Sequence, residues 1–319
     1  MKLKEVCMRF LLTLCLLFSA AIIPASALAT GAHSPTVPGK LAATLDELAA
    51  KFDPTVCADC HEQIYEEWSQ SMHSKSFIDP RVIQTWRTFI KQGLEKEAGM
   101  TKMDMKNNCM WCHAPYIKYA DDKLVSEIID MVLTAADDPD ESKRDAAVKQ
   151  LSKLNLNCYG CHNLFAVKDG YWGNKPEEGA IYGPRGEDDP EEAKHEDFKT
   201  IKSDFLTTSK FCASCHHGCP DSVPFSQCPT VYSSYKQEYL DKGGKETCQD
   251  CHMKPDDPDD PKSHKFKGAH DKDFFAAAME LEIDADTTQV VSHYKNEITP
   301  TLAFNVKLTN RSGHGIPYG

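Results

Sequence analysis

Ten cysteines of this chain occur in pairs that share one spacing and one following residue. Each pair is separated by two residues and followed at once by histidine, in the strings CADCH, CMWCH, CYGCH, CASCH and CQDCH. Two thiols at this spacing can add to the two vinyl groups of one porphyrin while the adjacent histidine reaches the iron. The pattern therefore predicts five covalently bound haem c groups. The attachment cysteines are Cys57, Cys60, Cys109, Cys112, Cys158, Cys161, Cys212, Cys215, Cys248 and Cys251, and the proximal histidines are His61, His113, His162, His216 and His252.

Zinc is the simplest competing ligand, because two Cys-x-x-Cys pairs can form a four-sulfur site. A zinc site gives no reason for a histidine after every pair, so zinc is the weaker interpretation. Two further cysteines, Cys219 and Cys228, lie outside the strings in GCPDSVPFSQC. In an oxidising compartment they are expected to form a local disulfide, with free or metal-bound thiols as the alternative.

The second axial ligand of each haem decides between an electron carrier and an enzyme. A haem with two protein ligands has no open position, whereas an open distal face can bind and transform a small molecule. Of the 13 histidines in the chain, eight lie outside the strings, more than the five that complete bis-histidine ligation needs. The candidate distal ligands are His73, His195, His217, His264, His270 and His314, while His33 and His293 are expected to be surface histidines.

The local contexts of these candidates differ. His73 follows a segment with apolar residues at helical spacing, so it is expected to project from a helix toward a neighbouring haem. His195 is expected to open a helix that leads to the fourth string. His217 directly follows a proximal histidine, and because adjacent side chains diverge, it could serve only a second, closely packed iron. The remaining candidates lie just past the fifth string or in a turn: His264, His270 and His314.

Charge and the N-terminal residues narrow the class of protein. A net charge of -12 over 319 residues argues against electrostatic capture of nucleic acid or anionic lipid. Residues 1–29 combine a basic start, an apolar run over 10–23 and small residues at 27–29, which is typical of a cleaved secretory signal. That apolar run is shorter than a membrane-spanning helix requires. The mature protein is therefore expected in the periplasm or outside the cell.

The expected fold class is mainly α-helical with much irregular loop, organised around stacked haems. Only 41% of the residues are hydrophobic, so porphyrin faces are expected to supply much of the interior. Apolar residues recur at helical spacing in 81–96, 122–134 and 141–154. Residues 170–187 are rich in Gly, Pro and aromatic residues and are expected to form a loop packed on porphyrin.

The C-terminal residues predict a short β element instead. Alternation of apolar and polar residues over 301–309 indicates a half-buried strand, which 281–283 and 289–294 could join. Two or three strands form a poor independent unit, so this element is expected to be a partial β-sandwich in a truncated chain, or one completed elsewhere. The predicted organisation is a signal peptide (1–29), an N-terminal linker (30–53), a pentahaem cytochrome c domain (54–275) and an incomplete C-terminal β segment (276–319).

The phrases around the strings resemble a known family. CADCH with EQIYEEWSQSMHSKSF, then FCASCH, CQDCHM, SHKFKGAH and TNRSGHGIPYG, is similar to cytochrome c-554-like multihaem c-type cytochromes over most of residues 54–319. The resemblance implies distal ligation by His73, His264 and His314, and a β-sandwich that opens at the phrase around His314. Relatives include soluble periplasmic carriers, subunits of membrane-associated redox complexes and extracellular filaments.

The sequence thus predicts an exported pentahaem cytochrome that relays electrons between a donor and an acceptor protein in anaerobic respiration, mostly through bis-histidine haems. A membrane quinol-oxidising complex or a terminal reductase would be a suitable partner. Two alternatives stay open. One is a filament subunit in which a histidine of one copy ligates a haem of the next, and the other is a reductase of nitrogen or sulfur oxyanions with one open haem. No string replaces its histidine with lysine, as many ammonia-forming nitrite reductases do, so no catalytic residue is assigned and a carrier is preferred to an enzyme.

Overall fold

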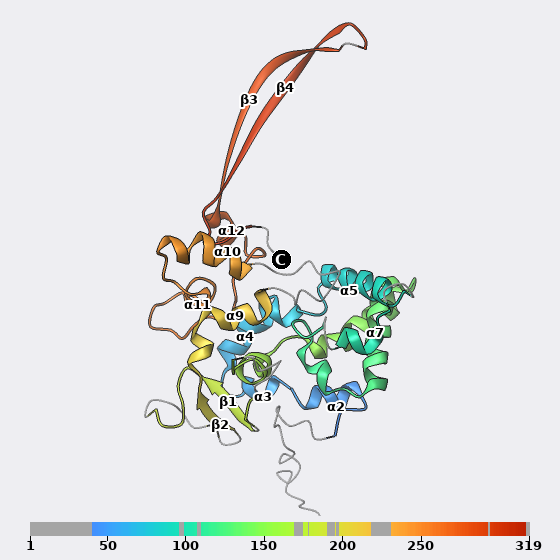
Figure 1. Cartoon of the computed structure of the whole chain (residues 1–319), viewed down its shortest axis with the longest axis vertical. Helices are drawn as coiled ribbons and strands as arrows, with labels where there is room; N and C mark the ends of the chain where they lie inside the picture. The colour runs from blue at the N-terminus through green and yellow to red at the C-terminus, as the bar shows by residue number, and fades with distance from the viewer. Residues whose placement is uncertain are drawn as a thin grey trace, which may run out of the picture. The chain divides into compact units, whose positions relative to one another are not determined.

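The computed structural model describes residues 40–95, 99–106, 110–168, 175–177, 179–189, 195, 198–217, 231–292 and 294–316, shown in Figure 1. These residues all lie in one compact unit, Ser34–Gly319. Several predictions concern residues outside the described ones: the signal peptide, the disulfide between Cys219 and Cys228, the attachment cysteine Cys109, and the surface histidines His33 and His293. Among the described residues, no helix is long and apolar enough to cross a membrane.

The first half of the described chain is helical, and the three helices predicted from apolar spacing are present. Their first turns are capped by the side chains of Asp79, Asp121 and Asp140, each of which accepts a hydrogen bond from a backbone N–H. The elements are α2 (Leu45–Ala50), α3 (Thr55–Ala58), α4 (Glu62–Gln70), η2 (His73–Lys75), α5 (Pro80–Gly93), α6 (Lys102–Asp104), η4 (Pro115–Tyr119), α7 (Asp122–Asp137), α8 (Glu141–Leu151), η5 (Ser152–Leu154) and the π-helical turn η6 (Gly160–Leu164).

These helices enclose a protein core of ordinary kind. Helix α7 contributes a buried apolar face that includes Ile128, Ile129 and Val132, and this helix packs against α5 and α8. Tyr116 of η4 and Phe52 stack within the same cluster, with ring centroids 4.4 Å apart. Although the fraction of hydrophobic residues in the whole chain is low, residues between 42 and 165 form a well-packed apolar core. The expectation of a mainly porphyrin-filled interior does not describe this half.

The second half contains less regular structure and few buried apolar residues. Among the described residues after Phe165, the buried apolar ones are Ala166, Ala180, Tyr182 and Tyr235. The elements are β1 (Ala180–Gly183), β2 (Lys199–Lys202), η7 (Asp204–Thr207), α9 (Ser209–His216), α10 (Val231–Glu238), η8 (Leu240–Lys242), α11 (Cys248–His252) and α12 (Lys272–Ala278).

Two local predictions in this half are wrong. Residues 170–187, expected as a loop, include strand β1, and the segment after His195, expected as a helix, includes strand β2. The two strands pair in parallel, with Ile181 opposite Thr200. The sequence KTIK places two β-branched residues between lysines, which favours a strand over a helix.

The C-terminal β element is one long antiparallel hairpin of β3 (Met279–Ser292) and β4 (Glu297–Asn310), visible as the two-stranded ribbon in Figure 1. Residues 281–283 and 289–292, expected to belong to separate partner strands, are parts of the single strand β3. In its register Leu281 faces Leu308 and Ile283 faces Val306, so one face is apolar. The prediction of a half-buried strand is wrong for the described residues, because Phe304 on that face is 60% exposed. Alternation of apolar and polar residues gives the hairpin an apolar face, but it does not provide a second layer of structure that would bury this face.

Candidate metal centres

The third, fourth and fifth strings fold as helical turns, and the first begins in the last turn of α3. Helix α11 coincides with the fifth string, Cys248–His252, and α9 ends with the fourth string at His216. In the first string the His61 N–H donates to the Cys57 carbonyl at 2.8 Å. One helical turn places the two cysteines and the histidine on the same side of the backbone. This local geometry allows all three to face one porphyrin.

Four of the five proximal histidines face a second histidine from a distant part of the chain. Two imidazoles on one iron, each with a nitrogen about 2 Å from the metal, would have ring centroids about 6 Å apart. The observed centroid separations are 5.9 Å for His61 and His195, 6.2 Å for His162 and His264, 6.1 Å for His252 and His314, and 6.4 Å for His216 and His73. The space between the rings therefore matches one iron in each case.

The angle between the two ring planes is larger in the pair of His216 and His73 than in the other three pairs. The planes of His162 and His264 meet at 25°, and those of His252 and His314 at 22°. The first-string pair is tilted by 32°, whereas the planes of the His216 and His73 rings meet at 60°.

Most of these histidines also have a hydrogen bond at Nδ1, which leaves Nε2 free for a metal. A ring nitrogen beside a carbonyl oxygen must carry the proton, so such a bond selects the tautomer and orients the ring. The Nδ1 contacts are His113 to the Ser76 carbonyl (2.7 Å), His162 to the Tyr182 carbonyl (2.8 Å), His195 to Thr200 Oγ1 (2.9 Å), His252 to the Lys267 carbonyl (2.6 Å), His264 to the Lys262 carbonyl (2.9 Å) and His314 to the Gly315 carbonyl (2.9 Å).

Loss of solvation favours the neutral form of six of the histidines at these sites, which is the form that binds a metal. Loss of solvation lowers the pKa of His73 to about 3 and that of His264 to about 4. The same cause lowers the pKa of four proximal histidines, namely His113, His162, His216 and His252. The paired rings fit a haem with two axial imidazoles at four strings, and at the third and fifth strings the tautomers of both ligands are also fixed.

The second string differs from the others. The ring of His113 lies beside Trp86 of α5, with centroids 5.7 Å apart and planes at 84°. Within the described part of the chain, no second histidine ring is paired with it. Trp86 is a neighbour that sequence reasoning missed, because a tryptophan at helical spacing signals only a core position.

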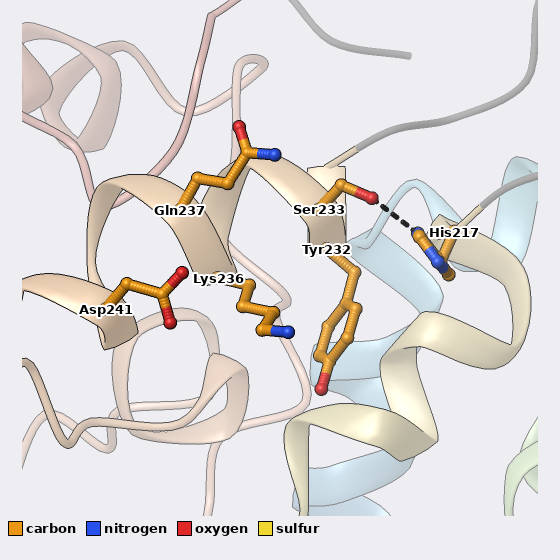
Figure 2. Close-up of a pocket in the computed structure, with 6 residues that line it drawn as sticks. All are labelled: His217, Tyr232, Ser233, Lys236, Gln237 and Asp241. Atoms are coloured by element: carbon orange, nitrogen blue, oxygen red, sulfur yellow. Dashed lines mark hydrogen bonds between the residues drawn. The ribbon is translucent and has the colours of Figure 1, made fainter.

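Two candidate ligands have other neighbours. The His217 ring packs on Tyr232, with centroids 5.4 Å apart, and its Nδ1 lies 3.2 Å from Ser233 Oγ. Figure 2 shows both contacts at the edge of a 390 Å³ pocket beside α10. The exposed His270 accepts a hydrogen bond from Arg81 Nη2 at 2.8 Å. Neither is paired with a proximal histidine of the described chain.

The strings lie close to one another through their thiols. All described cysteines are free, and thiols of different strings lie close enough to shift one another's pKa, in the pairs Cys57 with Cys158, Cys212 with Cys248 and Cys112 with Cys215. The first string therefore adjoins the third, and the fourth adjoins both the second and the fifth. The fourth string is a junction in this set of contacts.

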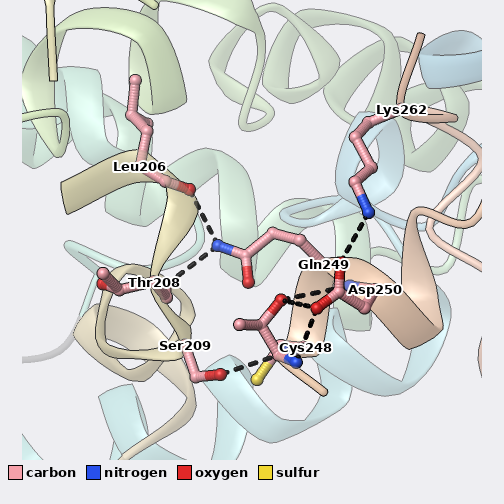
Figure 3. Close-up of polar contacts among 8 residues, drawn as sticks. Leu206, Thr208, Ser209, Cys248, Gln249, Asp250 and Lys262 are labelled. Atoms are coloured by element: carbon pink, nitrogen blue, oxygen red, sulfur yellow. Dashed lines mark hydrogen bonds and ion pairs between the residues drawn. The ribbon is translucent and has the colours of Figure 1, made fainter. Parts of the chain in front are cut away.

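Residues inside and beside the strings hold neighbouring strings together, as Figure 3 shows for the fourth and fifth. The buried Gln249 donates through Nε2 to the carbonyls of Leu206 and Thr208 at 2.8 and 2.9 Å. The Cys248 N–H donates to Ser209 Oγ at 3.1 Å. Sequence reasoning missed Gln249, since the two variable positions of a string have no required residue type.

These features together fit a c-type cytochrome. Residues 56–132, which include the first two strings, match the family model of cytochrome c554 and c-prime. The chain matches no curated protein and no solved structure. The family match supports a c-type cytochrome with covalently bound haem c, and it suggests electron transfer.

Proposed function

We propose that this chain is an exported pentahaem cytochrome c that relays electrons between redox proteins. The observation that carries the proposal is the set of four histidine pairs, whose ring centroids lie 5.9 to 6.4 Å apart. The paired histidines come from distant parts of the sequence, so local chain geometry does not explain their separations. Five Cys-x-x-Cys-His strings supply the covalent attachment.

Haem bound at these sites supplies a one-electron iron couple. The residues of the chain hold the iron and exclude other ligands. At the four paired sites a histidine on each side would fill both axial positions, which would leave small molecules no open coordination site there. The cysteines of neighbouring strings lie near one another, so the sites they would attach are close together, which a relay requires.

The cellular context of the proposal follows from charge and from the N-terminal residues. The signal-like segment over 1–29 supports a periplasmic or extracellular location. A net charge of -12 favours weak, salt-sensitive docking to basic patches on redox partners, such as a membrane quinol-oxidising complex or a terminal reductase.

The first test is the haem content of the protein matured in a host that attaches haem c. Intact mass and absorption should give five haems, and the Cys212→Ser, Cys215→Ser double variant should give four. The matched control is Cys219→Ser, Cys228→Ser, which lies outside the strings and should retain five. A colourless product, or one with the mass of the bare polypeptide, would overturn the proposal.

One observation favours a second function, a reductase with one open haem. His113 has Trp86 as its ring neighbour and no paired histidine among the described residues. A high-spin signal in the oxidised protein that responds to nitrite or cyanide would support this alternative. A fully low-spin spectrum in dilute protein would exclude it. A low-spin signal that appears only when copies associate would instead favour the filament, with a ligand supplied by another copy.

A further inference from the structure

The second ligand at the fourth string has an unusual environment. His73 is half-buried, and its Nδ1 atom is buried without a hydrogen-bond partner. Six other histidines of the strings and pairs have an Nδ1 contact between 2.6 and 2.9 Å. Burying a polar atom without a hydrogen-bond partner destabilises the folded state. Such an atom in a candidate metal ligand therefore calls for a functional explanation.

An apolar side chain lies against this ring. Phe266 packs edge-on to His73, with ring centroids 4.5 Å apart and planes at 75°. Its backbone has a φ of 46°, a region that a non-glycine residue adopts only when its surroundings impose it. The same ring also lies 5.6 Å from that of His264.

The loop around Phe266 is held from both sides. Glu67 of α4 accepts hydrogen bonds from the His264 N–H at 2.7 Å and from Ser263 Oγ at 3.1 Å. On the other side of Phe266, the Lys267 carbonyl accepts from Nδ1 of His252 at 2.6 Å. These bonds hold Phe266 against His73 and explain how its positive φ is maintained.

The missing hydrogen bond has a consequence for redox potential. An Nδ1–H that donates to an acceptor makes the imidazole a more basic ligand, which stabilises the oxidised metal. Both histidines of the third-string pair have such a contact to a carbonyl oxygen, as do both of the fifth-string pair. In the first-string pair, His195 Nδ1 lies 2.9 Å from the hydroxyl of Thr200, which can accept or donate. Among the described residues, neither His73 nor His216 has such a contact at Nδ1.

We propose that His73, kept without an acceptor by Phe266, gives the fourth string the highest reduction potential of the four paired sites. This inference rests on the proposed function. The cysteines of the fourth string lie beside those of the second and the fifth, so the site that is reduced most readily also adjoins two other sites. The chain thereby collects electrons at an interior site rather than at an end.

The first test is a redox titration of the complete protein followed by low-temperature electron paramagnetic resonance. Near-parallel imidazoles split two iron d orbitals, whereas crossed ones leave them close in energy and raise the largest g value. The 60° pair should therefore give a signal distinct from the pairs at 22° to 32°. We expect this signal to be reduced first among the low-spin sites, and the His73→Ala variant to lack it. The inference is overturned if another low-spin signal is reduced earlier.

A pair of variants at Phe266 isolates the cause. Phe266→Asn offers a carbonyl oxygen to Nδ1, and asparagine tolerates a positive φ. Phe266→Leu also removes the ring but offers no acceptor. We expect the asparagine variant to favour the oxidised site about tenfold, equal to about 59 mV for a one-electron couple, and the leucine variant to leave the potential nearly unchanged.

Equal shifts in the two variants, or no shift in the asparagine variant, would refute the role of the acceptor. Haem content separates this failure from failure of the proposed function. Five haems with an unchanged potential refute the inference alone, whereas absent haem refutes both.

Discussion

Removal of a single hydroxyl group from Tyr116 should destabilise the protein, because this hydroxyl holds the start of the third string. Its Oη donates to Asn157 Oδ1 and accepts from the N–H groups of Asn157 and Gly160 at 3.1 and 3.0 Å. The residue is fully buried, and burial raises the pKa of its hydroxyl well above the usual range, so the group stays a neutral donor.

The loss of unfolding free energy in Tyr116→Phe depends on which groups lose their hydrogen-bond partner when the hydroxyl is removed. Gly160 N–H retains the Asn157 carbonyl at 2.9 Å, and Asn157 Oδ1 retains the Tyr159 N–H at 3.1 Å. Only the Asn157 N–H loses its acceptor. One lost hydrogen bond and one buried, unpaired donor amount to about 2–3 kcal/mol of unfolding free energy.

Tyr119 provides a matched control on the same 3-10 helix. It is also buried and packs on Phe52 at 5.3 Å, but its hydroxyl has no hydrogen bond among the described residues. Tyr119→Phe should therefore change the unfolding free energy by almost nothing. Guanidinium unfolding of the two haem-bound variants, followed by far-UV circular dichroism, measures the difference in unfolding free energy. The comparison requires that both variants have the same denaturant dependence. Equal losses in the two variants, or less than about 1 kcal/mol in Tyr116→Phe, would refute this account.

Two further predictions concern the fifth string and the ligand pairs. Asp250 completes the capping box of α11 with Thr247, and its ion pair with Lys262 lowers its pKa from 3.8 to about 2. Asp250→Ala should thus cost about 1 kcal/mol at neutral pH. Because the folded-state pKa is depressed, this contribution is complete above pH 3.8 and disappears as the pH falls through 2, where unfolding curves of variant and parent should converge. Curves that stay apart there would contradict it. His264→Ala should convert one low-spin signal to a high-spin signal that responds to cyanide, because His162 loses its partner at 6.2 Å. His270→Ala, which removes only a contact to Arg81, should leave the spectrum unchanged. If His270→Ala instead produced the high-spin signal and His264→Ala did not, His270 would be the ligand.

Local chemistry was predictable from the sequence. A Cys-x-x-Cys-His string needs only one helical turn to bring its three side chains together, so its interpretation does not depend on the rest of the fold. The same holds for α7, whose apolar residues recur at helical spacing, and for the hairpin, whose alternation defines its two faces. These features depend on residues within a few positions of one another.

Pairing between strings required the tertiary structure. His264 follows the fifth string closely, yet its ring faces His162 of the third, while the fifth-string histidine faces His314. The placement of Trp86 beside His113, and of Phe266 against His73, likewise follows from the path of the whole chain. Residue type specifies which atoms can bind a metal. Packing between distant segments decides which two ligand residues meet. The path of the chain is set by hydrophobic contacts and backbone hydrogen bonds, and these do not depend on which ligand residue the segment carries.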